Sequence, residues 1–553
     1  MNKFLLVLLV CCSYILSAES PYRYIVYFKD KSQEPDLSLF TKKALEKRAK
    51  YNIPFDERDY AVNTSYIDEL KNNNATVLYQ SNWLNAALIQ TDQQNIELIK
   101  QLPFVTSVQW VGGGDVKRIR KSKLSGPQSK KGVQSCEETD ACTDIEYEEG
   151  FTSSYAQTHL LNGEYLHEQG FNGEGMTIAI CDNGFYKANE NPAFSTIYSE
   201  NRVLGTYDYV HGDSAVYDEY TGPSNNRQSH GSNCFSFIGG IKADQYIGTS
   251  NKSSFYLFHT EDNGGERLQE EFNLAMALER CSQLGVDVVT ISLGYTTFDV
   301  PGENHDTSIL RTNSAPSTKA VNTAVSKGII VLVAAGNEGT GSWKYISCPS
   351  DADSAIAVAA VDINGNVASF SGYGLPNDPR VKPNVAAVGV NASHLTISGN
   401  VISGNGTSYS CPALAGMVTC LWQAFPTKTN WEIKTAVEQS ASKYLNPDKR
   451  VGYGIPDFKK AYQNLSTPTF VSNPRLENEY SIFPNPAENR IYISNTGNSH
   501  IQSIELMNTM GQVVFNRSFS DDNSIGLEDL SKGMYLLQIA TDQGILLKKI
   551  IKD

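Results

Sequence analysis

The stretch IIVLVAAG, residues 329–336, is apolar from end to end and shows no alternation of polar and apolar side chains. Such a run is typical of a strand buried on both faces, because a half-exposed strand would alternate. Four further runs share this character, and stretches with helical spacing, such as 268–284 and 316–327, separate several of them. The four are TIAIC (177–181), SSFYLFHT (253–260), DVVTISLGY (287–295) and AIAVAAVD (355–362). The pattern predicts an α/β domain with a predominantly parallel sheet covered by helices on both faces.

Polar residues stand at the places where sites of parallel sheets gather, the carboxyl ends of the strands and the starts of helices. Asp182 directly follows the run TIAIC (177–181), and Asn337 directly follows the run IIVLVAAG (329–336). His230 and Ser408 each stand at the start of a predicted helix. Singly, each has an ordinary structural explanation, such as an N-cap for Ser408. Together, an acid, an imidazole, an amide and a hydroxyl supply the parts of an acyl-transfer site.

The motifs DNGF, SHG, SLG, AAGN and GTSYSCP occur in this order, far apart. They resemble those of the subtilisin-like serine peptidases, the subtilases, over residues 150–465, and the chain order Asp, His, Ser distinguishes that family from other serine hydrolases. The resemblance implies a subtilisin-like fold and a serine endopeptidase in which Ser408 is the nucleophile and His230 the general base. It also implies that Asp182 orients the imidazole. The side-chain amide of Asn337 and the backbone N–H of Ser408 would form the oxyanion hole.

The resemblance further assigns two short segments to the binding of polypeptide substrates. One would pair with the substrate backbone as an added strand, and the other would border the pocket for the residue before the scissile bond. Their small side chains predict a roomy, apolar pocket. The six residues are Ser292, Leu293, Gly294, Ala334, Ala335 and Gly336. We also expect Pro412 to lie in the first turn of the helix that Ser408 opens, where a missing N–H costs little.

This chemistry requires no cofactor, and the sequence offers no metal ligands at a recognisable spacing. Calcium is common among subtilases, but no acidic ligand loop in this sequence is assigned to it. One alternative is a cysteine peptidase with Cys181 or Cys411 as nucleophile, although neither has a helix start of its own. The other is a catalytically silent subtilase-fold binding protein. The presence of all four polar residues argues against a silent protein.

The first 18 residues have the features of a secretory signal peptide. Lys3 precedes an apolar run that is too short to span a bilayer. A lipoprotein cysteine at Cys11 or Cys12 is the alternative, although the preceding Val10 is not small. No other stretch is a candidate membrane span. The sequence therefore predicts export from the cytoplasm.

Export permits disulfides, and eight of the ten cysteines lie beyond the signal peptide. Cys136 and Cys142 are close neighbours in a polar segment, so we expect them to pair, with a zinc knuckle as the alternative. The other six stand mostly in apolar contexts and are predicted to be buried thiols. Among them, Cys234 lies one helical turn after His230, where some subtilases have a free thiol.

Residues 21–115 alternate short strands and helices and predict a small α/β domain. The domain resembles subtilase propeptides, which cover the active site and assist folding. Residues 116–149 follow as a linker that includes the basic stretch 117–132, with a nucleic-acid patch as the alternative. The net charge of −14 and the pI near 5.2 argue against a nucleic-acid partner. We expect self-processing within about 112–150.

Residues 466–478 form a second linker, and residues 479–553 contain short alternating strands with glycine turns. They predict a β-sandwich of some seven strands. The stretches FPNP, NTMGQVV, LSKGMYLLQI and KKIIKD resemble the sorting domain that the type IX secretion machinery recognises, with a carbohydrate- or surface-binding module as the alternative. We therefore expect passage through the periplasm and a final location outside the cell or on its surface.

Overall fold

The structure is a computed structural model of the 553-residue chain. It describes residues 22–113, 153–218, 229–262, 264–466, 476, 479–497, 499–508, 513–518, 524–541 and 544–553. The predicted signal peptide, the first linker and the expected Cys136–Cys142 pair lie outside the described residues. The chain divides into two compact units, Met1–Gln463 and Asn464–Asp553. No helix in the described part of the chain is long and apolar enough to cross a membrane.

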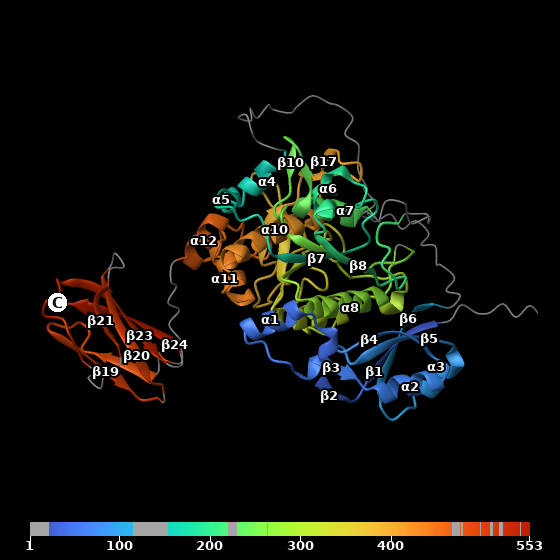
Figure 1. The fold of residues 1–553 in the computed structure, drawn as a ribbon, viewed down its shortest axis with the longest axis horizontal. Coiled ribbons are helices and arrows are strands. Elements are labelled where there is room, and N and C mark those ends of the chain that lie inside the picture. Colours follow the sequence, from blue (N-terminus) through green and yellow to red (C-terminus); the bar gives the residue numbers. More distant parts are fainter. Residues whose placement is uncertain are drawn as a thin grey trace, which may run out of the picture. The chain divides into compact units, whose positions relative to one another are not determined.

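A seven-stranded parallel sheet forms the centre of the larger unit, in the order β15-β14-β13-β12-β7-β11-β8 (Figure 1). The five predicted apolar runs supply five of its strands. Four of these are buried at every position, as expected for strands covered on both faces. In chain order the strands are β7 (Thr177–Asp182), β8 (Val203–Asp208), β11 (Ser254–His259), β12 (Val288–Ile291), β13 (Ile330–Ala334), β14 (Ile356–Val361) and β15 (Val385–Val388).

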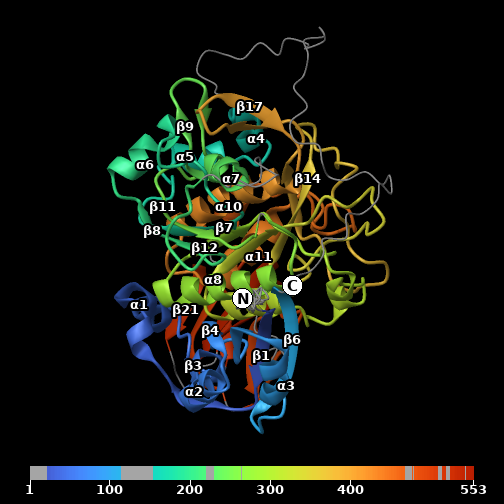
Figure 2. The same cartoon turned by 90° about the vertical axis from the view of Figure 1, so that its right-hand side faces the viewer.

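Helices cover both faces of this sheet, which confirms the predicted architecture (Figures 1 and 2). Helices α8 (Gln269–Leu284) and α9 (Pro316–Ser326) pack together on one face, and α7 (His230–Gly239) and α10 (Thr407–Ala424) on the other. Local sequence sets their ends: Gly285 ends α8 in a left-handed conformation, and Pro316 occupies the first turn of α9, where no N–H is needed. Two more helices, α11 (Asn430–Ser440) and α12 (Phe458–Ser466), follow α10.

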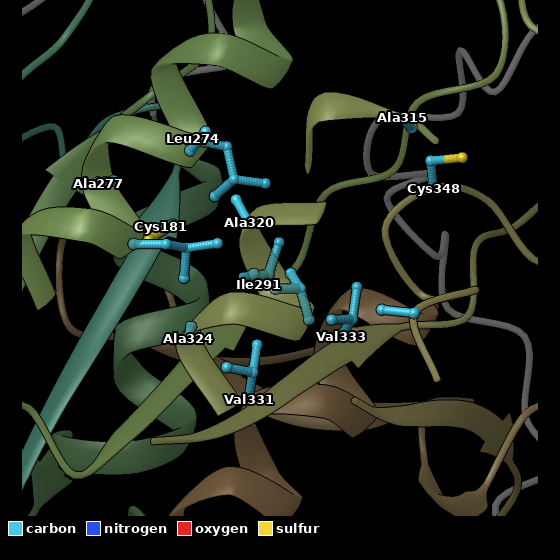
Figure 3. Packing of buried hydrophobic residues seen from close by; sticks show 14 of the residues in the cluster. Cys181, Leu274, Ala277, Ile291, Ala315, Ala320, Ala324, Val331, Val333 and Cys348 are labelled. Atoms are coloured by element: carbon cyan, nitrogen blue, oxygen red, sulfur yellow. The ribbon is translucent and has the colours of Figure 1, made fainter. Parts of the chain in front are cut away.

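The main core lies between the sheet and helices α8 and α9 (Figure 3). Small alanines on both helices face branched side chains on the strands, so the helices approach the sheet closely. The labelled residues at this interface are Leu274, Ala277, Ala320, Ala324, Cys181, Ile291, Val331 and Val333. Each has an exposed fraction of 1 % or less.

The amino-terminal part of this unit is a four-stranded antiparallel sheet, β4-β5-β1-β6, with helices α2 (Thr64–Asn72) and α3 (Gln93–Ile99). Its strands are β1 (Tyr22–Phe28), β4 (Thr76–Ser81), β5 (Ala86–Thr91) and β6 (Val105–Gly113). Alternate residues of β5 face opposite ways: Ala87 and Ile89 pack on the domain's own helices, whereas Ala86 and Leu88 join the core beside α8. Both faces of this small sheet are therefore covered, as Figure 2 shows.

The smaller unit consists of two antiparallel sheets, which agrees with the predicted β-sandwich. Apolar side chains of both sheets form one buried cluster that includes Ile491, Leu506, Ile525 and Leu537. One sheet contains β18 (Tyr480–Phe483), β19 (Arg490–Asn495) and β22 (Ser524–Gly526). The other contains β20 (Ile501–Asn508), β21 (Val513–Ser518), β23 (Gly533–Thr541) and β24 (Gly544–Lys552).

Candidate active site

Asp182 and His230 meet at the carboxyl edge of the central sheet. Asp182 ends β7 and is fully buried, and His230 begins α7 with its side chain 30 % exposed. His230 Nδ1 lies 2.8 Å from Asp182 Oδ1, which also accepts the backbone N–H of Asn183. Because an ionised carboxylate can only accept, Nδ1 carries the proton and Nε2 is left as the basic nitrogen.

Gly231 explains how α7 comes so close to β7. A Cβ added at this glycine would lie 2.3 Å from the carbonyl oxygen of Gly184 and 3.1 Å from Cβ of Asp182. Any larger residue would push the start of the helix away from the carboxylate. The glycine of the SHG motif is therefore required for the contact between Asp182 and His230.

The electrostatics of His230 favour its charged form. Burial by itself lowers the pKa of the imidazole, but the negative charge of Asp182, with a contribution from Cys234, outweighs burial and raises the pKa well above its usual value. The pair therefore stabilises a proton on His230, as is needed of a base that holds a proton between two steps of a reaction.

Ser408 lies in the first turn of α10, beside His230. Its Oγ donates to the carbonyl oxygen of Ser292 at 3.3 Å. Cys234 bridges the two residues, because its Sγ lies 3.7 Å from His230 Nδ1 and 3.4 Å from the carbonyl oxygen of Ser408. The three strand-edge and helix-start residues predicted from sequence, Asp182, His230 and Ser408, thus come together at one place.

The expectation for Pro412 is wrong. Helix α10 begins at Thr407, so Pro412 lies in the second turn and not in the first. Without an N–H, Pro412 cannot bond the carbonyl oxygen of Ser408 four residues earlier. That oxygen is bonded instead by Ser292 Oγ at 3.1 Å and by the Cys234 thiol. Because of the proline, the carbonyl oxygen of Ser408 is free to bond the segment after β12, through Ser292, and helix α7, through Cys234.

Asn337 follows β13 and holds its amide in a defined orientation. Its Oδ1 accepts from the backbone N–H of Thr407 at 2.9 Å and from the Thr407 hydroxyl at 3.1 Å. A backbone N–H can only donate, so Oδ1 is identified and Nδ2 points elsewhere. A Cβ added at Gly406 would lie 3.9 Å from both Nδ2 of Asn337 and Cβ of Ser408. The glycine therefore keeps open the space between the amide and the serine.

A family model described as the subtilase family matches residues 173–454, slightly more than half of the chain. The chain belongs to the subtilase family. Two further models match, the peptidase S8 propeptide domain of Bacteroidota at residues 23–128 and the secretion system C-terminal sorting domain at residues 481–553. This subtilase is thus a serine endopeptidase with its own propeptide, and its sorting domain implies a secreted or cell-surface protein.

Relatives agree with this assignment. Subtilisin E from Bacillus subtilis (strain 168) is 26 % identical over 360 residues, which cover 64 % of this chain and 84 % of the relative. An alkaline protease from Shouchella clausii is 25 % identical over 424 residues, which cover 76 % of this chain and 92 % of the relative. The crystal structure of fervidolysin from Fervidobacterium pennivorans, a keratinolytic enzyme related to subtilisin, has a TM-score of 0.52 at 17 % identity. It covers 95 % of this chain and 71 % of that one, and supports the fold.

The two predicted substrate segments of the subtilase follow neighbouring strands. Ser292–Gly294 continues from β12, and Ala334–Gly336 ends β13 and leads into Asn337. From sequence we expect only small apolar side chains beside these segments. The structure differs, because the side chains of Glu338 and Ser347 also lie against Gly336 and Gly294. Sequence reasoning missed both residues and also missed Thr407. Glu338 could have been noticed beside Asn337, but no local pattern marks Ser347.

The propeptide makes one set of contacts with the subtilase domain through the loop after β4 and a second set through helix α1 (Lys42–Lys50), which also reaches α8 at Ser282. On α8, the Glu279 carboxylate accepts the backbone N–H groups of Asn82 and Trp83, each at 3.1 Å, and the Ser81 hydroxyl at 3.0 Å. The second contact is made by helix α1 at the opposite edge of the sheet from the candidate active site, where β7 and β12 begin.

The contact made by α1 is rich in ion pairs. Lys43 and Lys47 lie 3.0 and 3.3 Å from the carboxylate of Asp287. Asp59 is held by Arg48 at 2.7 Å and by Lys327 of the subtilase domain at 2.6 Å. Since the side chains of Arg48, Asp59 and Lys327 are each at most 5 % exposed, this second group of charges is buried between the two domains.

Three groups of side chains in the described part of the subtilase bring enough ligand atoms together for a metal ion. One is the Asp182 site itself. In the second, Asp208 Oδ2 accepts from two imidazoles, those of His211 and His259, at 2.9 and 2.8 Å. Its Oδ1 accepts two backbone N–H groups, so both oxygens of Asp208 are already bonded.

The third group is carboxylic, with Glu261, Glu266 and Glu270. Both oxygens of Glu270 accept backbone N–H groups, and Glu261 accepts the hydroxyl of Tyr295 at 2.8 Å. Burial raises the pKa of Glu261 to about 8 and that of Glu270 well above its usual value. Most of these oxygens already accept hydrogen bonds from protein donors, and we assign no calcium ion to this group.

The six described cysteines are all free and buried, as predicted: Cys181, Cys234, Cys281, Cys348, Cys411 and Cys420. Burial raises the pKa of the Cys411 thiol to about 12. For Cys181, a hydrogen bond with Cys281 and burial raise the pKa well above its usual value. Because the thiolate is the nucleophilic form, neither alternative cysteine nucleophile is favoured.

Proposed function

We propose that Ser408, His230 and Asp182 act as a catalytic triad that hydrolyses polypeptides through an acyl-enzyme. The Ser408 hydroxyl attacks the scissile carbonyl carbon and its proton passes to His230 Nε2. The leaving amine then takes this proton as the C–N bond breaks. Water attacks the acyl ester in the second step, with His230 again as the base, which releases the acid and restores Ser408. Asp182 orients the imidazole and stabilises its charged form.

The observation that carries this proposal is the hydrogen-bonded pair of Asp182 and His230, with the backbone of Ser408 held next to it through Cys234. The 2.8 Å contact between Asp182 and His230 fixes the tautomer that a base requires. Cys234 contacts both His230 and the backbone of Ser408, which supports their being neighbours. A buried carboxylate beside a partly exposed imidazole and a helix-start serine is the arrangement that acyl transfer needs.

The oxyanion that forms during attack would be held by Nδ2 of Asn337 and by the backbone N–H of Ser408. Thr407 supports this role because its two donors occupy Oδ1 and leave the amide nitrogen of Asn337 to donate. Ser408 also lies at the start of α10, where free N–H groups attract negative charge. Such donors stabilise the transition state more than the ground state.

Substrate would lie along Ser292–Gly294 as an added strand, with the side chain before the scissile bond between this segment and Ala334–Gly336.

The proposed function also gives each part of the chain a role and a range. We assign the signal peptide to 1–18, the propeptide to 21–115, the processing linker to 116–149, the peptidase to 150–465 and, after the linker 466–478, the sorting domain to 479–553. Deletion of 479–553 should leave active enzyme in the periplasm, and unchanged secretion would contradict this role.

A fluorophosphonate tests the catalytic proposal directly, because it forms a covalent bond only with an activated serine. We expect the processed enzyme to gain one label, located at Ser408 by peptide mass spectrometry. Ser408→Ala should take up none, whereas Ser403→Ala, an exposed serine on the preceding strand β17 (Val401–Gly404), should label like the wild type. Unlabelled wild type would favour the alternative of a catalytically silent binding protein.

A further inference from the structure

Three side chains at the end of strand β8 converge on one another and take no part in the proposed catalysis. They are Asp208, the last residue of β8, His259, the last residue of β11, and His211, which lies in the turn after β8. One oxygen or ring nitrogen of each lies within 4.8 Å of the other two. Two imidazoles beside one carboxylate are a ligand set typical of transition metals, so the geometry of this group needs a closer description.

The fold brings the three side chains together in two steps. In the parallel pair of β11 and β8, His259 stands directly opposite Asp208, so both side chains leave the sheet on the same face. The chain then turns back after β8, because the N–H of Gly212 bonds the carbonyl oxygen of Asp208 at 2.9 Å. Gly212 has a φ of 81°, a left-handed conformation that suits glycine. This turn returns His211 to the carboxylate of Asp208.

One oxygen of Asp208 is fixed by the backbone, and the other serves both histidines. Oδ1 accepts the N–H groups of Val210 and His211 at 2.7 and 3.0 Å, which sets the orientation of the carboxylate. Oδ2 accepts from Nδ1 of His259 at 2.8 Å and from Nδ1 of His211 at 2.9 Å. The two ring nitrogens and this oxygen therefore face one another. Hydrogen bonds that orient a carboxylate in this way are usual where the carboxylate binds a metal.

Metal binding would need only a change of tautomer in the two rings. A carboxylate oxygen only accepts, so each Nδ1 carries a proton while it bonds Asp208. With an ion beside Oδ2, each ring would hold its proton on Nε2 and offer the lone pair of Nδ1 to the metal. The side chains of Asp208 and His259 are each 3 % exposed, whereas that of His211 is 59 % exposed. Water would therefore reach the ion on one side and complete a tetrahedral set of ligands.

The donor set favours a transition metal over calcium. Calcium takes about six to eight oxygen ligands, and this group offers one carboxylate oxygen, because the other is held by two backbone N–H groups. The remaining two donors are imidazole nitrogens, which suit zinc and its neighbours among the transition metals. Zinc is also satisfied by three protein ligands and one water molecule.

We propose that Asp208, His211 and His259 bind one zinc ion. The ion ties the turn after β8 to the end of β11. This turn leads to Val216, whose carbonyl oxygen accepts the N–H of Phe185 at 2.8 Å, in the DNGF motif that contains the candidate catalytic aspartate. The zinc ion thus stabilises a segment that supports the active site, and it takes no part in the chemistry. The inference goes beyond the proposed function and does not depend on it.

The test measures the binding of Zn²⁺ to the full chain carrying Ser408→Ala, in which the proposed nucleophile is absent and self-cleavage is avoided. Isothermal titration calorimetry should find one zinc ion per chain, which an excess of calcium does not displace. X-ray absorption at the zinc edge should show only nitrogen and oxygen ligands, at about 2.0–2.2 Å. Zinc held by a thiol, such as that of Cys234 beside His230, would instead show sulfur at about 2.3 Å.

A pair of histidine variants in the same Ser408→Ala chain locates the site. His211→Ala should weaken Zn²⁺ binding by at least about 100-fold, because loss of an outer-shell partner alone costs about 10–100-fold. His159→Ala is the matched control, since this imidazole is 58 % exposed and its Nδ1 lies 2.6 Å from the carboxylate of Glu164. This control should bind Zn²⁺ like its parent.

Three results would each overturn the assignment: no saturable binding of Zn²⁺, sulfur among its ligands, or equal affinity in His211→Ala and its parent. Displacement of the zinc by calcium would overturn the choice of metal. The absorption spectrum of the parent decides the ligand set even if His211→Ala does not fold.

Discussion

The buried charges at the second propeptide contact give a prediction whose size can be worked out. Lys327 Nζ lies 2.6 Å from Asp59 Oδ2, and Arg48 binds the same carboxylate. Lys327→Met keeps most of the side chain but removes its charge. Loss of one member of a buried ion pair costs about 3–5 kcal/mol. Because Arg48 remains, we take the lower end, about 3 kcal/mol, which weakens propeptide binding roughly 100-fold.

The assay starts from the processed complex, in which the propeptide has been cut but is still bound. After dilution into fluorogenic substrate, the rate at which activity appears reports dissociation, the step in which most affinity changes are expressed. Lys327→Met should release its propeptide about 100-fold faster than the wild type. Lys319→Met, at an exposed lysine on α9, is the matched control. Release of the Lys327 variant within about twofold of wild type would refute the reasoning.

Four further predictions concern the catalytic centre. Asn337→Leu should lower kcat by about 10²–10³ with little change in KM, a magnitude that was measured on subtilisin and is carried over here; an unchanged kcat would remove Asn337 from the oxyanion hole. Activity needs neutral His230, whose pKa is raised, so kcat/KM should rise with pH through a pKa above the usual 6.5. In Asp182→Asn the residual activity should show this rise at lower pH, and an unshifted profile would contradict the role of the carboxylate. A small mercurial should inhibit the wild type by crowding the imidazole, whereas Cys234→Ala should stay active and resist it; equal sensitivity would place the reactive thiol elsewhere. Tyr409 follows the nucleophile where many subtilases have an oxidisable methionine, so activity should persist in dilute peroxide, and rapid loss would count against this explanation.

Four of the five strands that the sequence predicts in the central sheet are buried at every position, as the continuous apolar runs indicate. β8 was not predicted, since it is an edge strand with Gly205 in its middle and several half-exposed positions. Its pattern is neither continuous nor cleanly alternating. β15 was not predicted either, although all four of its residues are buried. Burial on two faces therefore allowed most strands of this sheet, but not all of them, to be predicted from sequence.

The residues of the candidate site that could be predicted from sequence are those at the ends of strands and the starts of helices. Asp182 ends β7 and Asn337 follows β13, so both lie at the carboxyl edge of the parallel sheet. Ser347 could not be predicted in this way. It lies in a loop, and no repeating pattern in the sequence indicates that this loop brings its side chain next to Gly294. The burial of Lys47 was equally hidden, since a lysine in an amphipathic helix is normally solvated and only the docking of α1 on Asp287 covers it.

The propeptide sheet is apolar on both faces, and this has a consequence for activation. While it is docked, Ile25, Leu88 and Val111 are shielded by the peptidase domain. Once detached, the sheet would turn that face to water, which favours unfolding or association over a return to the enzyme. An unfolded propeptide in the presence of an active protease would soon be degraded. Detachment would then run in one direction, with no pool of free propeptide left to bind again.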